Sequence, residues 1–134
     1  MKTFLKNLFT NPYIIMMIIL LLLSFTLVII HDNNISILRR EIVIQVMMKD
    51  LNDFYADLNA DVYANKNRTT IYLSSSKFNT NSYAKITAVY QPVLKIVGVK
   101  KIVFFKTVEN DGKVVNISEI EYDVQKDKFN ILII

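Results

Sequence analysis

The chain of 134 residues has no cysteine, no tryptophan, one histidine, two glycines and two prolines. Without cysteine it forms no disulfide, offers no thiol nucleophile and lacks the ligands of cysteine-based zinc sites. The single histidine, His31, borders an apolar segment, where an interfacial role is favoured over proton transfer. The usual catalytic triads and the common zinc sites therefore lack their components, and two glycines leave no loop that cradles phosphate. We expect a protein that is not an enzyme and that uses no metal or cofactor.

The charge balance is only mildly basic. Sixteen lysines and arginines against 12 aspartates and glutamates give a net charge of +4, and the basic residues are scattered along the chain. Nucleic-acid binding needs basic residues concentrated on one surface, so we exclude nucleic acid as a partner. The abundance of isoleucine, lysine and asparagine is typical of an AT-rich bacterial genome.

One long apolar run stands out near the amino terminus. Residues 14–30 carry no charged side chain and would form about 26 Å of helix, which Pro12 and Tyr13 extend toward the hydrocarbon thickness of a bilayer. No A-x-A-like cleavage site follows the run, so an uncleaved anchor is favoured over a signal peptide. A helix that is apolar on every face is also unusual in a small soluble protein. We expect a transmembrane helix over residues 12–30, in contact with the lipid bilayer.

The charges that flank this segment predict its orientation. Lys2 and Lys6 precede it, and Arg39, Arg40 and Lys49 follow within about 20 residues, so the positive charges on the two sides nearly balance. Closest to the span, however, the amino-terminal side carries only positive charge whereas Asp32 stands on the other side, which favours a cytoplasmic amino terminus. In a bacterium the remainder would lie in the periplasm. The expected organisation is a cytoplasmic tail over residues 1–11, the span over 12–30, a juxtamembrane helix and linker over 31–66, and an extracytoplasmic α+β domain over 67–134.

Beyond the span, apolar residues three, four and seven apart predict a helix over residues 35–58. This spacing suits either a coiled coil with a neighbour or packing on the chain's own domain. Four aspartates, at 50, 53, 57 and 61, follow one side, where a solvated acidic face is favoured over a metal site. Val62 occupies the glycine position of an EF-hand-like stretch, so we reject calcium. The candidates for partner contact are Ile44, Met47, Leu51, Phe54 and, on the sheet, Phe104.

The rest of the chain alternates between strand and helix signals. We predict strands over residues 68–76, 99–108, 113–124 and 129–134, and a helix over 82–97 with a kink or break caused by Pro92. Asp111 and Gly112 predict a tight hairpin turn. A helix between the first two strands implies a parallel crossover, and an antiparallel meander then completes a βαβββ domain. One helix covers one sheet face, so the other face needs the helix over 35–58 or a second polypeptide.

The stretch FNTNSYAKITAVYQPVLKIVGVKKIVFF, residues 78–105, resembles the opening of the OmpA/MotB C-terminal family. The resemblance implies a helix that leads into a parallel strand. In that family a G-H-T-D-like run follows and binds peptidoglycan, whereas Phe105, Lys106, Thr107 and Val108 stand here. No peptidoglycan-binding residue is carried over. The layout is also similar to small single-span subunits of secretion, pilus or flagellar machines.

Two functions remain open on the sequence alone. The first is a single-pass structural or adaptor subunit of a bacterial envelope complex of the secretion, pilus, flagellar-motor or division type. It would dock its periplasmic domain on other membrane or periplasmic subunits, with a homo-oligomer left open. The second is a periplasmic binding or sensor module that recognises peptidoglycan or a small ligand.

Overall fold

The computed structural model describes residues 1–132 and divides into two compact units, one ending at Ile35 and the other starting at Ser36. Both units take part in helix α2 (Pro12–Phe54), which runs without interruption. The predicted α+β class is confirmed. Ile133 and Ile134, the end of the strand predicted over 129–134, lie outside the described residues.

The first unit consists of α1 (Lys2–Thr10) and the beginning of α2. Asn11 precedes α2, and its side-chain oxygen accepts a hydrogen bond of 3.0 Å from the Tyr13 amide, which satisfies an otherwise unpaired amide of the first turn. Ser24 and Thr26 donate their hydroxyls to backbone carbonyls four residues earlier, at 2.9 and 2.8 Å. The most apolar part of α2 is not buried at all within the chain. The length and apolar composition of this helix are consistent with a single transmembrane span.

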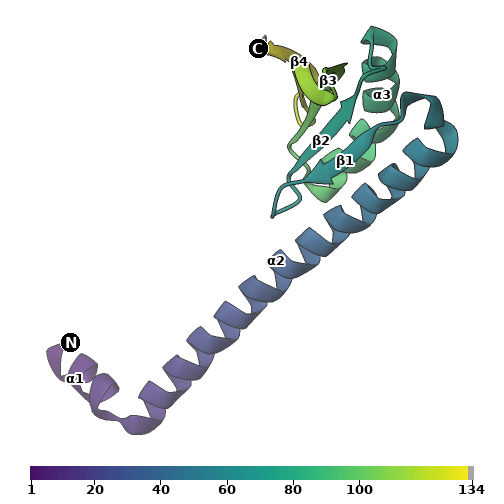
Figure 1. The fold of residues 1–134 in the computed structure, drawn as a ribbon. Helices are drawn as coiled ribbons and strands as arrows, with labels where there is room; N and C mark the ends of the chain where they lie inside the picture. Colours follow the sequence, from purple (N-terminus) through teal and green to yellow (C-terminus); the bar gives the residue numbers. More distant parts are fainter. Residues whose placement is uncertain (133–134) are drawn as a thin grey trace. The chain divides into compact units, whose positions relative to one another are not determined.

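Among the described residues, the second unit holds a five-stranded sheet in the order β1-β2-β3-β4-β5. Figure 1 labels strands β1 to β4 of this sheet. Strands β2 and β3 are parallel and all other neighbours are antiparallel, as the predicted crossover and meander require. After α2, its elements are η1 (Ala56–Leu58), β1 (Asp61–Ala64), β2 (Thr70–Ser75), α3 (Thr80–Val97), β3 (Lys101–Asn110), β4 (Lys113–Asp123) and β5 (Lys128–Leu132).

The sheet contains one strand more than predicted, so the domain is ββαβββ rather than βαβββ. The additional strand, β1, falls in the range expected to be juxtamembrane helix and linker. It has only four residues at the sheet edge, and so short a segment leaves little periodicity to detect. Asn65 closes the turn into β2, because its side-chain oxygen accepts hydrogen bonds from the amides of Thr69 and Thr70 at 2.9 and 3.1 Å.

Helix α3 is not broken at Pro92, and its assigned residues run without interruption from Thr80 to Val97. Proline removes one backbone hydrogen bond, while Tyr90 and Leu94 on either side of it are buried. We attribute the continuity to this packing. Asn79 begins the helix with a capping box shared with Ser82, and Gly98 ends it with a φ of 87°, a conformation that glycine adopts without steric cost.

The core lies on one face of the sheet, where two apolar rows cross all five strands. The first row is Val62, Leu73, Phe104, Ile120 and Ile131, and the second is Ala64, Ile71, Ile102, Tyr122 and Phe129. Buried residues of both α2 and α3 belong to the same core cluster. Because strand residues alternate between faces, the two helices cover the same face. The helix over 35–58 therefore does not cover the opposite face, which was one of the two predicted possibilities.

Two adjacent polar residues of α2 bond to the turn between β1 and β2. The Arg40 side chain donates a hydrogen bond of 3.0 Å to the Asn67 carbonyl, and Glu41 forms an ion pair with Arg68. Gln45 donates a second hydrogen bond to the Glu41 carboxylate at 2.8 Å. The bonds from Gln45 and then Arg68 lower the pKa of Glu41 below its ordinary value. This part of α2 is thus an integral element of the folded domain.

Candidate interaction surfaces

The structure separates the five predicted contact residues into two groups. Ile44, Met47 and Leu51 on α2 are 3%, 0% and 3% exposed, and Phe104 on β3 is fully buried. These four side chains form part of the core of their own domain, so they are not available on its surface. Phe54, at the end of α2, is 77% exposed. Of the predicted set, only Phe54 is exposed on the surface of the folded chain.

The sequence did not reveal an apolar groove between α3 and β5, which we call the β5 groove. Its volume is about 240 Å³, and it is lined by Thr80, Tyr83, Ala84, Ile120, Phe129 and Ile131. Phe129 and Ile131 lie on the core face, in register with Tyr122 and Ile120. They nevertheless remain 39% and 74% exposed. The core layer is therefore incomplete at this end of the sheet.

The opposite face of the sheet carries a row of aromatic rings. Tyr63 and Tyr72 stack with their centroids 4.9 Å apart, and Phe105 continues the row 6.2 Å from Tyr72. Lys101 and Glu121 form an ion pair of 3.5 Å on the same face. Tyr63 is 52% exposed. The Lys101–Glu121 pair lies on the same face as the aromatic row, so this face is mixed in character. It suits docking less well than the mainly apolar β5 groove.

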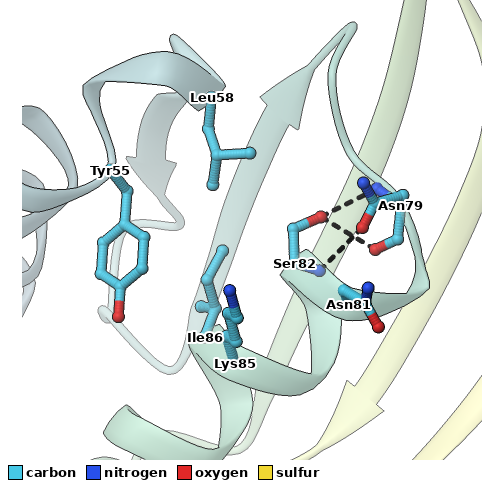
Figure 2. A pocket seen from close by; sticks show the side chains of 7 residues that line it. All are labelled: Tyr55, Leu58, Asn79, Asn81, Ser82, Lys85 and Ile86. Atoms are coloured by element: carbon cyan, nitrogen blue, oxygen red, sulfur yellow. Dashed lines mark hydrogen bonds between the residues drawn. The ribbon is translucent and has the colours of Figure 1, made fainter.

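A smaller pocket lies beside the start of α3, with Tyr55 and Leu58 on one side (Figure 2). The polar groups of Asn79 and Ser82 bond to each other there. The Asn79 side chain accepts from the Ser82 amide at 3.0 Å, and the Ser82 hydroxyl accepts from the Asn79 amide at 2.8 Å. These groups serve to cap the helix. We therefore assign the pocket a structural role.

The aspartates predicted to form a solvated acidic face do not gather into a metal site. In residues 1–132, no group of three or more histidine, cysteine, aspartate or glutamate side chains is placed to hold a metal ion. Asp50 instead accepts a hydrogen bond of 3.0 Å from the Tyr90 hydroxyl, which joins α2 to α3. Burial, and then this bond to a carboxylate, raise the pKa of Tyr90 above its ordinary value. Asp53 and Asp57 are exposed.

Comparison with known proteins adds no assignment: no protein-family model, curated protein or solved structure matches this chain.

Proposed function

We propose that this chain is a non-enzymatic docking subunit of a bacterial envelope complex, anchored in the inner membrane by one span. In this proposal the amino terminus is cytoplasmic and the α+β domain is periplasmic. The span confines the domain to the membrane, and the domain recruits or positions another subunit. The complex would be of the secretion, pilus, flagellar-motor or division type.

The anchoring part of the proposal is supported by the first half of α2. Its most apolar window has a mean hydropathy of 3.0, and none of that window is buried within the chain. Water solvates such an apolar surface poorly, whereas lipid hydrocarbon solvates it favourably. Lys2 and Lys6 before the uncharged segment of α2 and Asp32 after that segment favour the proposed orientation.

The docking part of the proposal rests on one observation, the β5 groove. Helices α2 and α3 cover the rest of the core face, yet Phe129 and Ile131 stay accessible beside Tyr83 and Ala84 of α3. Burying apolar surface that is left exposed at the edge of a core contributes a favourable free energy of about 25 cal/mol per Å². A partner subunit that inserts apolar side chains into the groove would complete this layer.

A matched pair of substitutions tests the docking surface. Ile131→Asp changes the groove, whereas Ile96→Asp changes an isoleucine of α3 outside the groove; the two side chains are 74% and 84% exposed. Both variants should fold, because substitutions at exposed positions usually change stability by less than about 0.5 kcal/mol. We expect full-length chain purified in mild detergent to lose a co-purifying membrane or periplasmic protein in Ile131→Asp and to keep it in Ile96→Asp.

Equal loss of the partner in both variants, or retention in both, would contradict docking through the groove. Circular dichroism of each variant establishes that the fold is intact. Phe54→Asp, at the remaining exposed residue of the predicted contact set, extends the same comparison to the end of α2.

One polar pocket favours a second candidate function, that of a ligand-binding or sensor module. It has a volume of about 270 Å³, lies at the ends of β2 and β3, and is lined by Asn59, Asp61, Ser74, Ser75, Ser76, Thr107, Glu109 and Val114. Hydroxyl and carboxylate groups of this kind suit a polar ligand such as a muropeptide. Saturable muropeptide binding by a chain that captures no protein would favour this function over docking.

A further inference from the structure

Helix α1 separates its apolar and polar side chains completely. At 100° per residue, the apolar side chains fall within an arc of about 140° around the helix axis, and the polar side chains occupy the opposite arc. The apolar set, which we call the α1 face, consists of Phe4, Leu5, Leu8 and Phe9. The polar set consists of Lys2, Thr3, Lys6, Asn7 and Thr10.

The chain itself does not cover the α1 face. Within the described residues no side chain of α1 is buried, and Phe4 and Phe9 are 68% and 65% exposed. Isolated helices shorter than about 12–15 residues are marginal in water, and α1 has nine residues. The α1 face therefore indicates a surface outside the chain that covers these apolar side chains and stabilises the helix.

Helix α1 is separate from α2, although only one residue joins them. Asn11 has an extended backbone, with φ −82° and ψ 114°, and its amide ends α1 by donating a hydrogen bond of 3.3 Å to the Asn7 carbonyl. Pro12 begins α2, and a proline disfavours the helical conformation in the residue before it. Because helical backbone stops at Asn11, α1 does not have to follow the direction of α2.

The short connection keeps α1 beside the point at which α2 would enter a bilayer. One extended residue reaches at most about 3.6 Å, so the end of α1 stays close to Tyr13, a residue type that favours the membrane–water interface. A helix of this size is only about 14 Å long, too short to cross a hydrocarbon core of about 30 Å. The surface within reach of α1 is thus the headgroup region of the bilayer.

We propose that α1 is an interfacial helix that lies along an anionic membrane surface, with the α1 face among the upper acyl chains and its lysines among the lipid headgroups. This inference rests on the proposed membrane anchoring, but it holds for either orientation of the span. Interfacial helices combine an apolar face with a polar face that carries lysine or arginine. Docked in this way, α1 fixes the depth at which α2 enters the bilayer.

The charges of α1 favour anionic lipid as the occupant. Lys2 and Lys6 lie one turn apart on the polar side, and the first acidic residue of the chain is Asp32. Anionic headgroups attract lysines that lie near the membrane surface. Lysine stems are long enough to bring the ammonium groups to the phosphates while the backbone lies deeper. A second copy of α1 would instead add positive charge.

Because the chain contains no tryptophan, one substitution places a single indole fluorophore at a chosen point of α1. Leu5→Trp probes the centre of the α1 face, and Thr3→Trp is the matched control, two residues away but about 160° around the helix. The full-length chain is reconstituted at low density in vesicles of phosphatidylcholine and phosphatidylglycerol that carry bromine on their acyl chains as the quencher. Both leaflets have the same composition, so the readout does not depend on the orientation of the span.

We expect brominated lipid to quench Leu5→Trp about threefold more strongly than Thr3→Trp, because the apolar side of an interfacial helix reaches about 5–10 Å into the boundary between headgroups and acyl chains. Adding Leu8→Asp to the Leu5→Trp chain should reduce its quenching to the level of Thr3→Trp. Helix α1 lies outside the second unit, so the melting temperature of the α+β domain should be the same in all these variants.

The lipid composition tests the role of the lysines. Quenching of Leu5→Trp should be weaker in vesicles of brominated phosphatidylcholine alone, and Lys2→Gln together with Lys6→Gln should remove this dependence on lipid charge. Equal quenching of the unmodified-lysine chain in both types of vesicle would overturn the preference for anionic lipid.

Alkaline carbonate extraction of the same vesicles separates the two proposals. A chain that stays in the vesicles but is quenched equally in Leu5→Trp and Thr3→Trp overturns the interfacial helix alone. A chain that washes off the vesicles overturns the anchoring and the interfacial helix together. A blue-shifted Leu5→Trp emission that resists quenching would show that protein rather than lipid covers the α1 face, which also overturns the interfacial helix.

Discussion

Leu51→Ala and Phe54→Ala, three residues apart on α2, are expected to have very different effects on stability. The Leu51 side chain is 3% exposed and belongs to the core cluster. Truncating a buried leucine to alanine loses its transfer free energy and leaves a cavity, which together cost about 3 kcal/mol. Phe54 is 77% exposed, so its truncation should change the free energy of unfolding by less than about 0.5 kcal/mol.

The expected loss is large enough to measure directly. For a domain of about 100 residues, each kcal/mol lowers Tm by about 4–8 °C, so Leu51→Ala should lower Tm by about 12–24 °C. Near-ultraviolet circular dichroism of the full-length chain in detergent follows the transition. The chain has seven tyrosines and no tryptophan, and all tyrosines except Tyr13 lie in the second unit. The signal therefore reports on the α+β domain rather than on the apolar helix.

Equal melting temperatures for the two variants would refute the placement of α2 against the sheet. The same conclusion would follow if Phe54→Ala caused the larger drop. Loss of a partner from Leu51→Ala without any change in Tm would restore the role in partner contact that the sequence predicts for Leu51.

Two further changes test polar and backbone features of the same domain. The folded-state pKa of Glu41 is lowered by its bonds to Gln45 and Arg68, so its stabilisation is complete above the unfolded value and is lost as pH falls through the folded one. The difference in Tm between wild type and Glu41→Gln should therefore be full at pH 7, begin to shrink as pH falls through the unfolded value of about 4.3, and disappear only below the lowered folded value. A difference that does not change with pH would contradict this. Gly98→Ala should lower the free energy of unfolding, measured in urea, by about 1 kcal/mol, since its φ of 87° is strained for any residue with a Cβ. An unchanged midpoint of the urea transition would show that the end of the helix can relax.

Features carried by local signals were predictable from the sequence. The turn at Asp111 and Gly112 is confirmed, with φ values of 51° and 73°, because a tight turn requires residues that tolerate positive φ. The apolar run of α2, the crossover helix and the three strands of the meander likewise follow from composition and spacing. Strand β1 was missed, since its four residues gain their stability from pairing with β2 rather than from a pattern of their own.

The interaction surfaces could not be predicted in the same way. The segment of α2 in the second unit contains two apolar sets with similar spacing, and the sequence does not show which set the sheet will bury. Packing decides this, and it buries Ile44 and Met47 while leaving Ile42 exposed. The β5 groove is still less visible, because it depends on how far α3 extends over the last strands.

The burial of one side of α2 has a consequence for biosynthesis. Ile44, Met47 and Leu51 share a core with Ile102, Phe104 and Tyr122, which the ribosome adds much later. During elongation, this apolar side of the nascent helix is synthesised before the strands against which it packs. These three side chains therefore remain outside their native core until translation reaches β4.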